Sequence, residues 1–207
     1  MTHTLHRLGS RQELEKDFIV FAMAAQNINR DGCAPKLRTV FLKMLEFNPV
    51  NFGDMKTGNK FNVGKDVVVA NIKDNSIVHA VFRDAATVAK VIGAIKELDT
   101  GMCITVSGLF DMVDKCCCEN HIQRHTTESS LGVLGRTDLL PPEKIRNITT
   151  MCGHGMVAAS LVEKMVDDIK LGLKTPEAAA AELARMCHCG IFNEPRAKEL
   201  LAALVAQ

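Results

Sequence analysis

The stretch IVHAVFRDAATVAKVIGAIKELDTGMCITVSGL, from Ile77 to Leu109, decides the fold class, because its apolar pattern changes period twice. Ile77 to Phe82 and Met102 to Leu109 are short apolar runs typical of strands. The second run is apolar on both faces, so we expect it at the centre of a sheet. Between the runs, an amphipathic helix is expected from the capping residue Asp84 to Leu98. Strand, helix and strand predict a βαβ unit with a right-handed crossover.

Upstream of this unit the pattern is less decisive. Apolar residues from Leu14 to Ala25 recur at helical spacing, but Phe18 to Met23 is also a continuous apolar run that fits a strand. Pro35 opens a helix whose apolar stripe runs to Leu45. Val67 to Ala70 is expected to be another strand, joined to the strand that begins at Ile77 by a turn around Asp74 and Asn75.

The last third of the chain reads as helical. Helices are expected over Met156 to Leu171 and Pro176 to Cys187, and Asn193 can cap a final helix that reaches Val205. We therefore predict an α/β (α+β) fold, with a small mixed sheet, a βαβ unit and a helical C-terminal part. The expected division is an α/β part over 1–138 and a helical Cys/His-rich part over 139–207, with one continuous domain as the alternative.

Composition narrows the classes of partner. The chain has 207 residues, and its 25 basic and 24 acidic residues are interspersed, which gives a formal net charge of +1. This balance does not indicate a nucleic-acid partner. No run approaches the roughly 18 apolar residues of a membrane span. The first ten residues lack the apolar core of a signal peptide, and His3 and His6 are interpreted as surface residues. We expect no membrane partner and a cytoplasmic protein.

Eight cysteines need an explanation, because disulfides are rare in the cytoplasm. They can be small core residues, metal ligands or reactive thiols. Cys116 and Cys117 continue a helical apolar stripe and are interpreted as core residues, whereas Cys118 could reach a site elsewhere. Cys33 and Cys103 are interpreted as structural. The remaining three are Cys152, Cys187 and Cys189.

These three cysteines lie where helices break, and the two helices between them form an αα-hairpin. Its arms would be about 24 and 18 Å long, so the end of the second helix comes close to the start of the first. The sequence therefore predicts a metal site made of Cys152, Cys187 and Cys189, with His154 as the likeliest fourth ligand. The cofactor would be zinc, held by three Cys and one His, or an iron–sulfur cluster held by three thiolates. His188 is a weaker candidate, because its side chain should alternate away from its neighbours. The alternative is that the thiols only fill tight helix corners.

A polar loop after the second strand carries the other candidates. His125 and Glu128 could move protons, and Arg136 could hold a carboxylate or phosphate of a small-molecule substrate. The alternative is that His125 is only a solvated loop residue. These residues suggest a metal- or iron–sulfur-dependent enzyme of lyase or hydrolase type, acting on a small polar substrate. The rival is a non-catalytic protein whose structural zinc, metal-delivery or thiol-redox site serves a partner protein.

A homodimer is also expected, at the Ala-rich C-terminal helices. Small residues let helices approach closely, and the stripe of Leu200, Leu201 and Leu204 needs an apolar surface to cover it.

Overall fold

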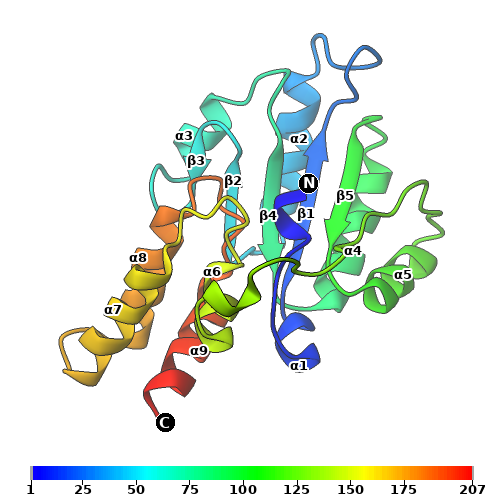
Figure 1. Ribbon diagram of the computed structural model, residues 1–207. Coiled ribbons are helices and arrows are strands. Elements are labelled where there is room, and N and C mark those ends of the chain that lie inside the picture. Colours follow the sequence, from blue (N-terminus) through cyan, green and yellow to red (C-terminus); the bar gives the residue numbers. More distant parts are fainter. Residues whose placement is uncertain (1, 207) are drawn as a thin grey trace.

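Five strands form one sheet in the order β3-β2-β4-β1-β5 in the computed structural model, which describes residues 2–206 (Figure 1). Each pair of neighbouring strands is antiparallel. Because β1 separates β4 from β5, and β4 separates β1 from β2, the chain forms two interleaved split βαβ units, the arrangement called ferredoxin-like. The strands are β1 (Phe18–Met23), β2 (Asn51–Asp54), β3 (Gly58–Asn59), β4 (Val78–Phe82) and β5 (Cys103–Ser107).

Helices cover both faces of the sheet. One group precedes the strands, connects them or directly follows the last of them: α1 (Arg11–Leu14), α2 (Ala34–Leu45), α3 (Lys65–Ala70), α4 (Ala85–Glu97) and α5 (Phe110–Glu119). The other group follows the sheet: α6 (Glu143–Thr149), α7 (Ala159–Lys170), α8 (Pro176–Met186) and α9 (Glu194–Val205). Two short 3-10 turns, Thr2–Thr4 and Thr137–Leu139, complete the described elements.

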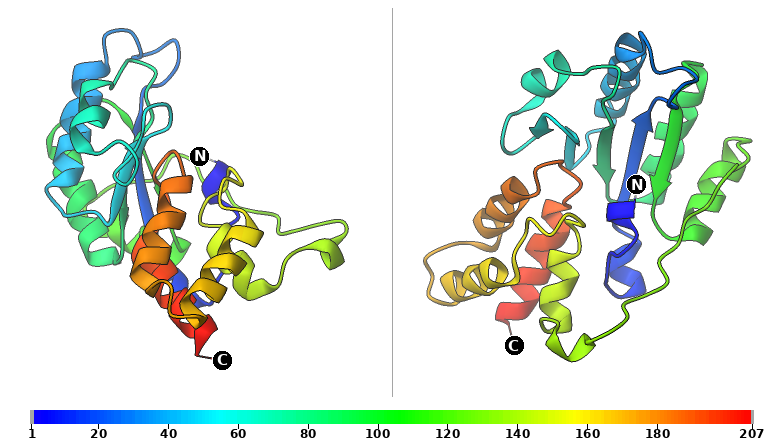
Figure 2. Two further views of the ribbon diagram at one scale, coloured as in Figure 1. Left: turned by 90° about the vertical axis from the view of Figure 1, so that its left-hand side faces the viewer. Right: turned by 45° about the horizontal axis from the view of Figure 1, so that its top comes forward.

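Strand β1 supplies both cores, because alternate side chains of a strand point to opposite faces. Phe18, Val20 and Ala22 pack with α2 and α4, whereas Ile19 and Phe21 pack with the C-terminal helices. Figure 2 shows the sheet between these two layers. A strand buried on both faces reads as a continuous apolar run, which is why its sequence resembles a helix as much as a strand.

The predicted α/β class, the βαβ unit and the helical C-terminal part are confirmed. Helix α4 begins after the Asp84 cap, whose carboxylate accepts from Thr87 N, and it connects β4 to β5. The sheet is antiparallel throughout rather than mixed, because β1 inserts between the two strands of the unit. The helical interpretation of Phe18–Met23 is wrong and its strand alternative is right.

Two further strand predictions need correction. Val67–Ala70 lies in helix α3, where Val68 is buried and Val67 is exposed. The strand prediction is wrong, because a short apolar run has the same appearance in a strand and in a buried helix. Met102–Leu109 contains β5, but β5 is the edge strand and not a central one. Ile104 and Val106 pack on the α2 and α4 side, while the other face carries small or polar residues that the C-terminal helices do not bury.

The C-terminal helices pack on the sheet of their own chain. Leu201 is buried there, and Leu200 and Leu204 pack against the same cluster, so the leucine stripe is covered without a second chain. The homodimer stays a prediction. None of the helices within residues 2–206 is both long and apolar enough to cross a membrane.

A buried carboxylate joins the N-terminal segment, the sheet and helix α9. Asp17, directly before β1, pairs with Arg7 Nη1 at 2.5 Å and with Arg196 Nη1 at 2.7 Å. Its Oδ1 also accepts from Asn193 Nδ2 at 3.0 Å. Arg196 Nη2 donates onward to the carbonyl of Leu8 at 2.5 Å. All of these side chains are almost inaccessible to water, so each charge depends on its partners.

Replacing Asp17 with Asn should destabilise the fold by about 3–5 kcal/mol, because two buried guanidinium groups would lose their counter-charge. Urea denaturation at neutral pH measures the change. The control is Glu199→Gln, which removes an exposed carboxylate paired with Arg83 and Lys16 and should cost less than about 1 kcal/mol. Equal losses in both variants would contradict a special role for the buried carboxylate.

The contribution of Asp17 should also depend on pH. Burial raises the pKa of Asp17, but Arg7 and Arg196 outweigh burial and hold the pKa below its ordinary value of 3.8. The ionised carboxylate therefore stabilises the folded state above about pH 4, and that stabilisation is lost as pH falls through the folded-state pKa. The gap in unfolding free energy between wild type and Asp17→Asn should shrink between pH 4 and lower pH. A gap that stays constant down to pH 2 would show that Asp17 is not ionised in the folded protein.

Candidate metal centre

Two loops bring three cysteines into one buried cluster. Cys152 lies in the turn after α6, and Cys187 and Cys189 lie in the loop between α8 and α9. The Sγ atoms of Cys187 and Cys189 are 3.9 Å apart, and the thiols of Cys152 and Cys187 are near enough to shift the pKa of one another. All three side chains are buried. The αα-hairpin of α7 and α8 joins the two loops, as its nearly matched arms predict.

His154 extends this row of donors to the surface. Its Nδ1 is 3.7 Å from Cys189 Sγ, and the residue itself is exposed. The ring of His3 stacks on the ring of His154, with centroids 4.5 Å apart and planes 15° from parallel. His188 points away from the sulfurs, since its Nε2 lies 3.4 Å from the carbonyl of Lys56. The structure therefore brings together Cys152, His154, Cys187 and Cys189 and leaves His188 outside.

Backbone amides near each sulfur lower the pKa of its thiol. The amide of Gly190 does so for Cys187, that of Ile191 for Cys189, and those of His154 and Met156 for Cys152. An amide dipole that faces a sulfur favours the thiolate over the thiol. Thiolates that bind metals are commonly held in this way, because the amides offset the negative charge of the sulfur.

The three thiols differ in acidity because they share hydrogen bonds. The bond from Cys187 lowers the pKa of Cys189 despite burial. For Cys187, the bond from Cys152 lowers the pKa, but the bond to Cys189 and burial outweigh it and raise the pKa to about 12. The bond to Cys187, together with burial, raises the pKa of Cys152. Of the three thiols, Cys189 is therefore the one that the cluster makes easier to deprotonate, and a bound cation would favour the thiolate at all three.

Side chains of the sheet hold the carbonyls of the second loop. Asn59 Nδ2 donates to the carbonyl of Cys187 at 2.7 Å and to that of His188 at 3.3 Å. His79 Nε2 hydrogen-bonds the carbonyl of Cys189, and burial lowers the pKa of His79 to about 4, so its ring is neutral. Asn51 Nδ2 donates to the carbonyl of Phe192 at 2.9 Å. These bonds hold the second cysteine loop against the sheet.

Arg7 ties the two cysteine loops together. Its Nη2 donates to the carbonyl of Met151 at 3.1 Å, next to Cys152, and also to the carbonyl of Ile191, two residues beyond Cys189. Its charge contributes to lowering the pKa of Cys189. The same guanidinium binds Asp17, so the site is anchored to the buried ion cluster.

As placed, the four donors form a row and do not surround one point. Within residues 2–206, no three His, Cys, Asp or Glu side chains meet around a common ion position. Rotation about the side-chain bonds of cysteine and histidine would be needed to gather them around an ion.

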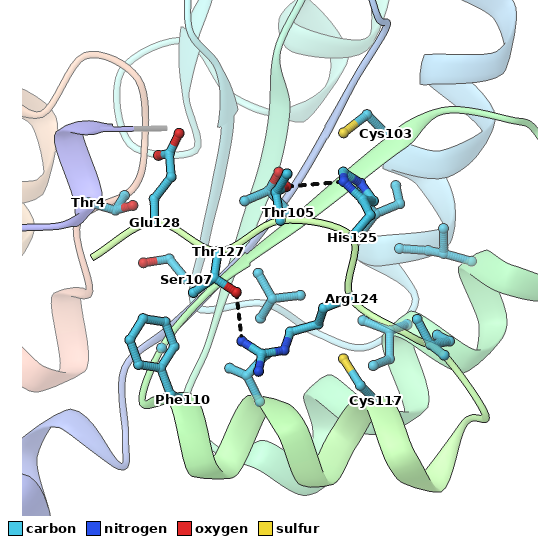
Figure 3. A pocket seen from close by; sticks show the side chains of 18 of the residues that line it. Thr4, Cys103, Thr105, Ser107, Phe110, Cys117, Arg124, His125, Thr127 and Glu128 are labelled. Atoms are coloured by element: carbon cyan, nitrogen blue, oxygen red, sulfur yellow. Dashed lines mark hydrogen bonds between the residues drawn. The ribbon is translucent and has the colours of Figure 1, made fainter. Parts of the chain in front are cut away.

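Two of the other predicted residues, His125 and Glu128, lie at a separate groove of about 1030 Å³ between β5 and segment 121–130 (Figure 3). His125 and Glu128 line it from the segment, facing β5 residues that include Cys103, Thr105 and Ser107. Arg136 lies outside the groove and pairs with Asp138 at 2.7 Å. None of the four predicted metal ligands is among the described residues that line this groove.

Three cysteines outside the cluster agree with their structural interpretation, whereas Cys103 lines the groove beside β5. Cys33, Cys116 and Cys117 are buried in the core on the α2 and α4 side. Cys118 is exposed on α5, whose buried residues belong to that same core, so it does not join the cluster.

Sequence reasoning missed the residues that support the cluster. His3 was expected at the surface, but it is half-buried against His154. The sequence gives one hint of His79, because it is a lone imidazole inside an apolar strand. It gives no hint of Arg7, Asn51 or Asn59, because these side chains bind backbone carbonyls distant in the chain.

Comparisons of the chain with protein-family models, with curated proteins and with solved structures found no match. Function has to be argued from the residues of the site.

Replacing Gly190 with Ala should dislodge the second cysteine loop. Gly190 has a φ of +87°, and a Cβ there would lie 2.6 Å from the carbonyl oxygen of Phe52 on β2. The control is Gly172→Ala, with a φ of +70° and no atom within 4 Å of the added Cβ. We expect the control to cost about 1–2 kcal/mol from backbone strain alone, and Gly190→Ala to cost about 1–3 kcal/mol more. Urea denaturation, with the rate of thiol labelling in the folded state, tests this. Equal losses and equal labelling rates would contradict the close packing of this loop on the sheet.

Proposed function

We propose that this protein binds one metal ion through the thiolates of Cys152, Cys187 and Cys189, with the imidazole of His154 as the fourth ligand. The observation that carries the proposal is the row of contacts from Cys187 through Cys189 to His154, with Cys152 in the same buried cluster. Three cysteines and one histidine are a common ligand set for zinc. The backbone amides near each sulfur support the same conclusion, because they lower the pKa of thiols that burial alone would raise.

A single ion suits the spacing better than a large cluster. Sulfurs around a tetrahedral zinc, with Zn–S bonds of about 2.3 Å, lie about 3.8 Å apart. The sulfurs of Cys187 and Cys189 are 3.9 Å apart. In a four-iron cluster each thiolate binds a different iron, which separates the sulfurs further. Zinc is therefore the first ion to test, and an iron–sulfur cluster is the alternative that iron analysis would detect.

A catalytic role is the second candidate, and the exposure of His154 favours it. His154 is the exposed member of the four ligands. With His154 bound, the ion is closed off and structural, and it joins the two loops. If water or a substrate replaced His154, the ion would gain an open position and could act as a Lewis acid. A hydrolase or lyase that acts on a small polar substrate would need that open position.

Replacing Cys187 with Ser should remove the metal. Wild type purified without oxygen should contain about one zinc per chain by elemental analysis, and Cys187→Ser should contain little, because the central thiol of the row is lost. The variant should also unfold more readily, since the free energy of metal binding stabilises the fold. The matched control is Cys33→Ser, which changes a buried thiol that donates to the carbonyl of Asp74 and should keep the metal.

Three results would contradict a single zinc ion. Wild type that neither contains zinc nor binds it at micromolar concentration would end the proposal. Iron with sulfide, in brown protein, would replace the ion with a cluster. Metal-free protein that oxidises to a disulfide within the cluster would favour the thiol-redox alternative.

A further inference from the structure

The imidazole of His3 has a buried nitrogen with no hydrogen-bond partner. Its Nε2 is one of the few buried side-chain nitrogen or oxygen atoms among the described residues that lack a partner. The others are guanidinium Nε atoms, whose remaining nitrogens can bond elsewhere, and one oxygen of Asn147. Among these unpartnered atoms, His3 Nε2 is the one that belongs to a side chain that commonly binds metals. A buried polar atom without a partner calls for a specific explanation, and a missing ion is one.

Its neighbours place His3 beside the cysteine cluster. The ring stacks on His154, whose Nδ1 contacts Cys189 Sγ, and its edge meets Phe21 with centroids 5.7 Å apart. The backbone is held as well, because the carbonyl of His3 packs against Gly153, where a Cβ would not fit. Gly153 lies between Cys152 and His154, so the turn Thr2–Thr4 is seated on the first cysteine loop.

We infer that His3 is a second imidazole ligand of the metal centre, able to hold the ion when His154 is displaced. This inference rests on the proposed function. His154 is exposed, whereas the unpartnered nitrogen of His3 is buried, so the two imidazoles differ in access to solvent. An ion held by three thiolates and His3 would keep four protein ligands, and water or a small anionic or thiol donor at the vacated position of His154 would be a fifth ligand. Reactive zinc sites can expand to five ligands in this way, whereas closed structural sites keep four.

The test uses the full chain, with Co²⁺ as the probe, because its visible absorption reports the number and type of ligands. His3→Phe keeps a ring to stack on His154 and Phe21 but removes the nitrogen. His154→Ala removes the exposed ligand, and a double variant combines the two. The control is His6→Ala, an exposed histidine on the same segment whose Nδ1 contacts Ser130.

We expect wild type and His6→Ala to bind one Co²⁺ with the same affinity and spectrum. His154→Ala should still bind Co²⁺ with a four-coordinate spectrum, and His3→Phe in that background should weaken binding by about tenfold or more. The spectrum of the double variant should also show that its Co²⁺ has no nitrogen ligand from an imidazole. These differences require a nitrogen at residue 3 and would not follow from ring packing alone.

The inference fails if the double variant binds Co²⁺ with the affinity and spectrum of His154→Ala, because His3 would then contribute no ligand. That result leaves a three-thiolate site intact. Wild type that binds no Co²⁺ at all overturns the proposed function itself, so the two failures are distinguishable. Circular dichroism of each variant, compared with His6→Ala, identifies any loss of binding that comes from unfolding.

Discussion

The buried carboxylate of Asp17 is the constraint on which the arrangement of the molecule depends. It lies at the start of the central strand and is paired with arginines from the two ends of the described chain, Arg7 and Arg196. A buried charge destabilises the fold unless it is paired and hydrogen-bonded. If either arginine moved away, the charges that stayed buried would lose part of their pairing. The N-terminal segment, the sheet and the C-terminal helices are therefore held in one relative position.

The geometry of the cysteine cluster, where we propose the metal site, depends on this buried ion cluster. One nitrogen of Arg7 faces Asp17, and another bonds the carbonyls of Met151 and Ile191, one in each cysteine loop. Asn59 and His79 then fix the second loop on the sheet. Loops usually tolerate variation, but here the sheet and the arginine determine where each carbonyl lies, and so where each amide can meet a sulfur. The thiols are held by the fold rather than by one another.

The sequence predicted the parts of the fold that depend on local pattern. Capping at Asp84, Thr175 and Asn193 located three helices, and the matched arms of the αα-hairpin placed Cys187 near Cys152. It could not show that Phe18–Met23 is central or that β5 is an edge, because an apolar run does not reveal its neighbours. Nor could it find Arg7, since a bond between a side chain and a carbonyl 184 positions away leaves no periodic trace.

Because the stabilising contacts join the beginning of the described chain to its end, the order of synthesis bears on how the protein reaches this state. Asp17 leaves the ribosome 179 residues before its partner Arg196, and His3 emerges long before the turn that seats it. The nascent sheet can pack early against α2 and α4, but its other face stays exposed to solvent until the last helices emerge. During that interval a chaperone could bind the exposed apolar face, next to a carboxylate that has only one of its two arginine partners. A thiol-bound ion could be loaded only at the final step, once the closing loop has docked.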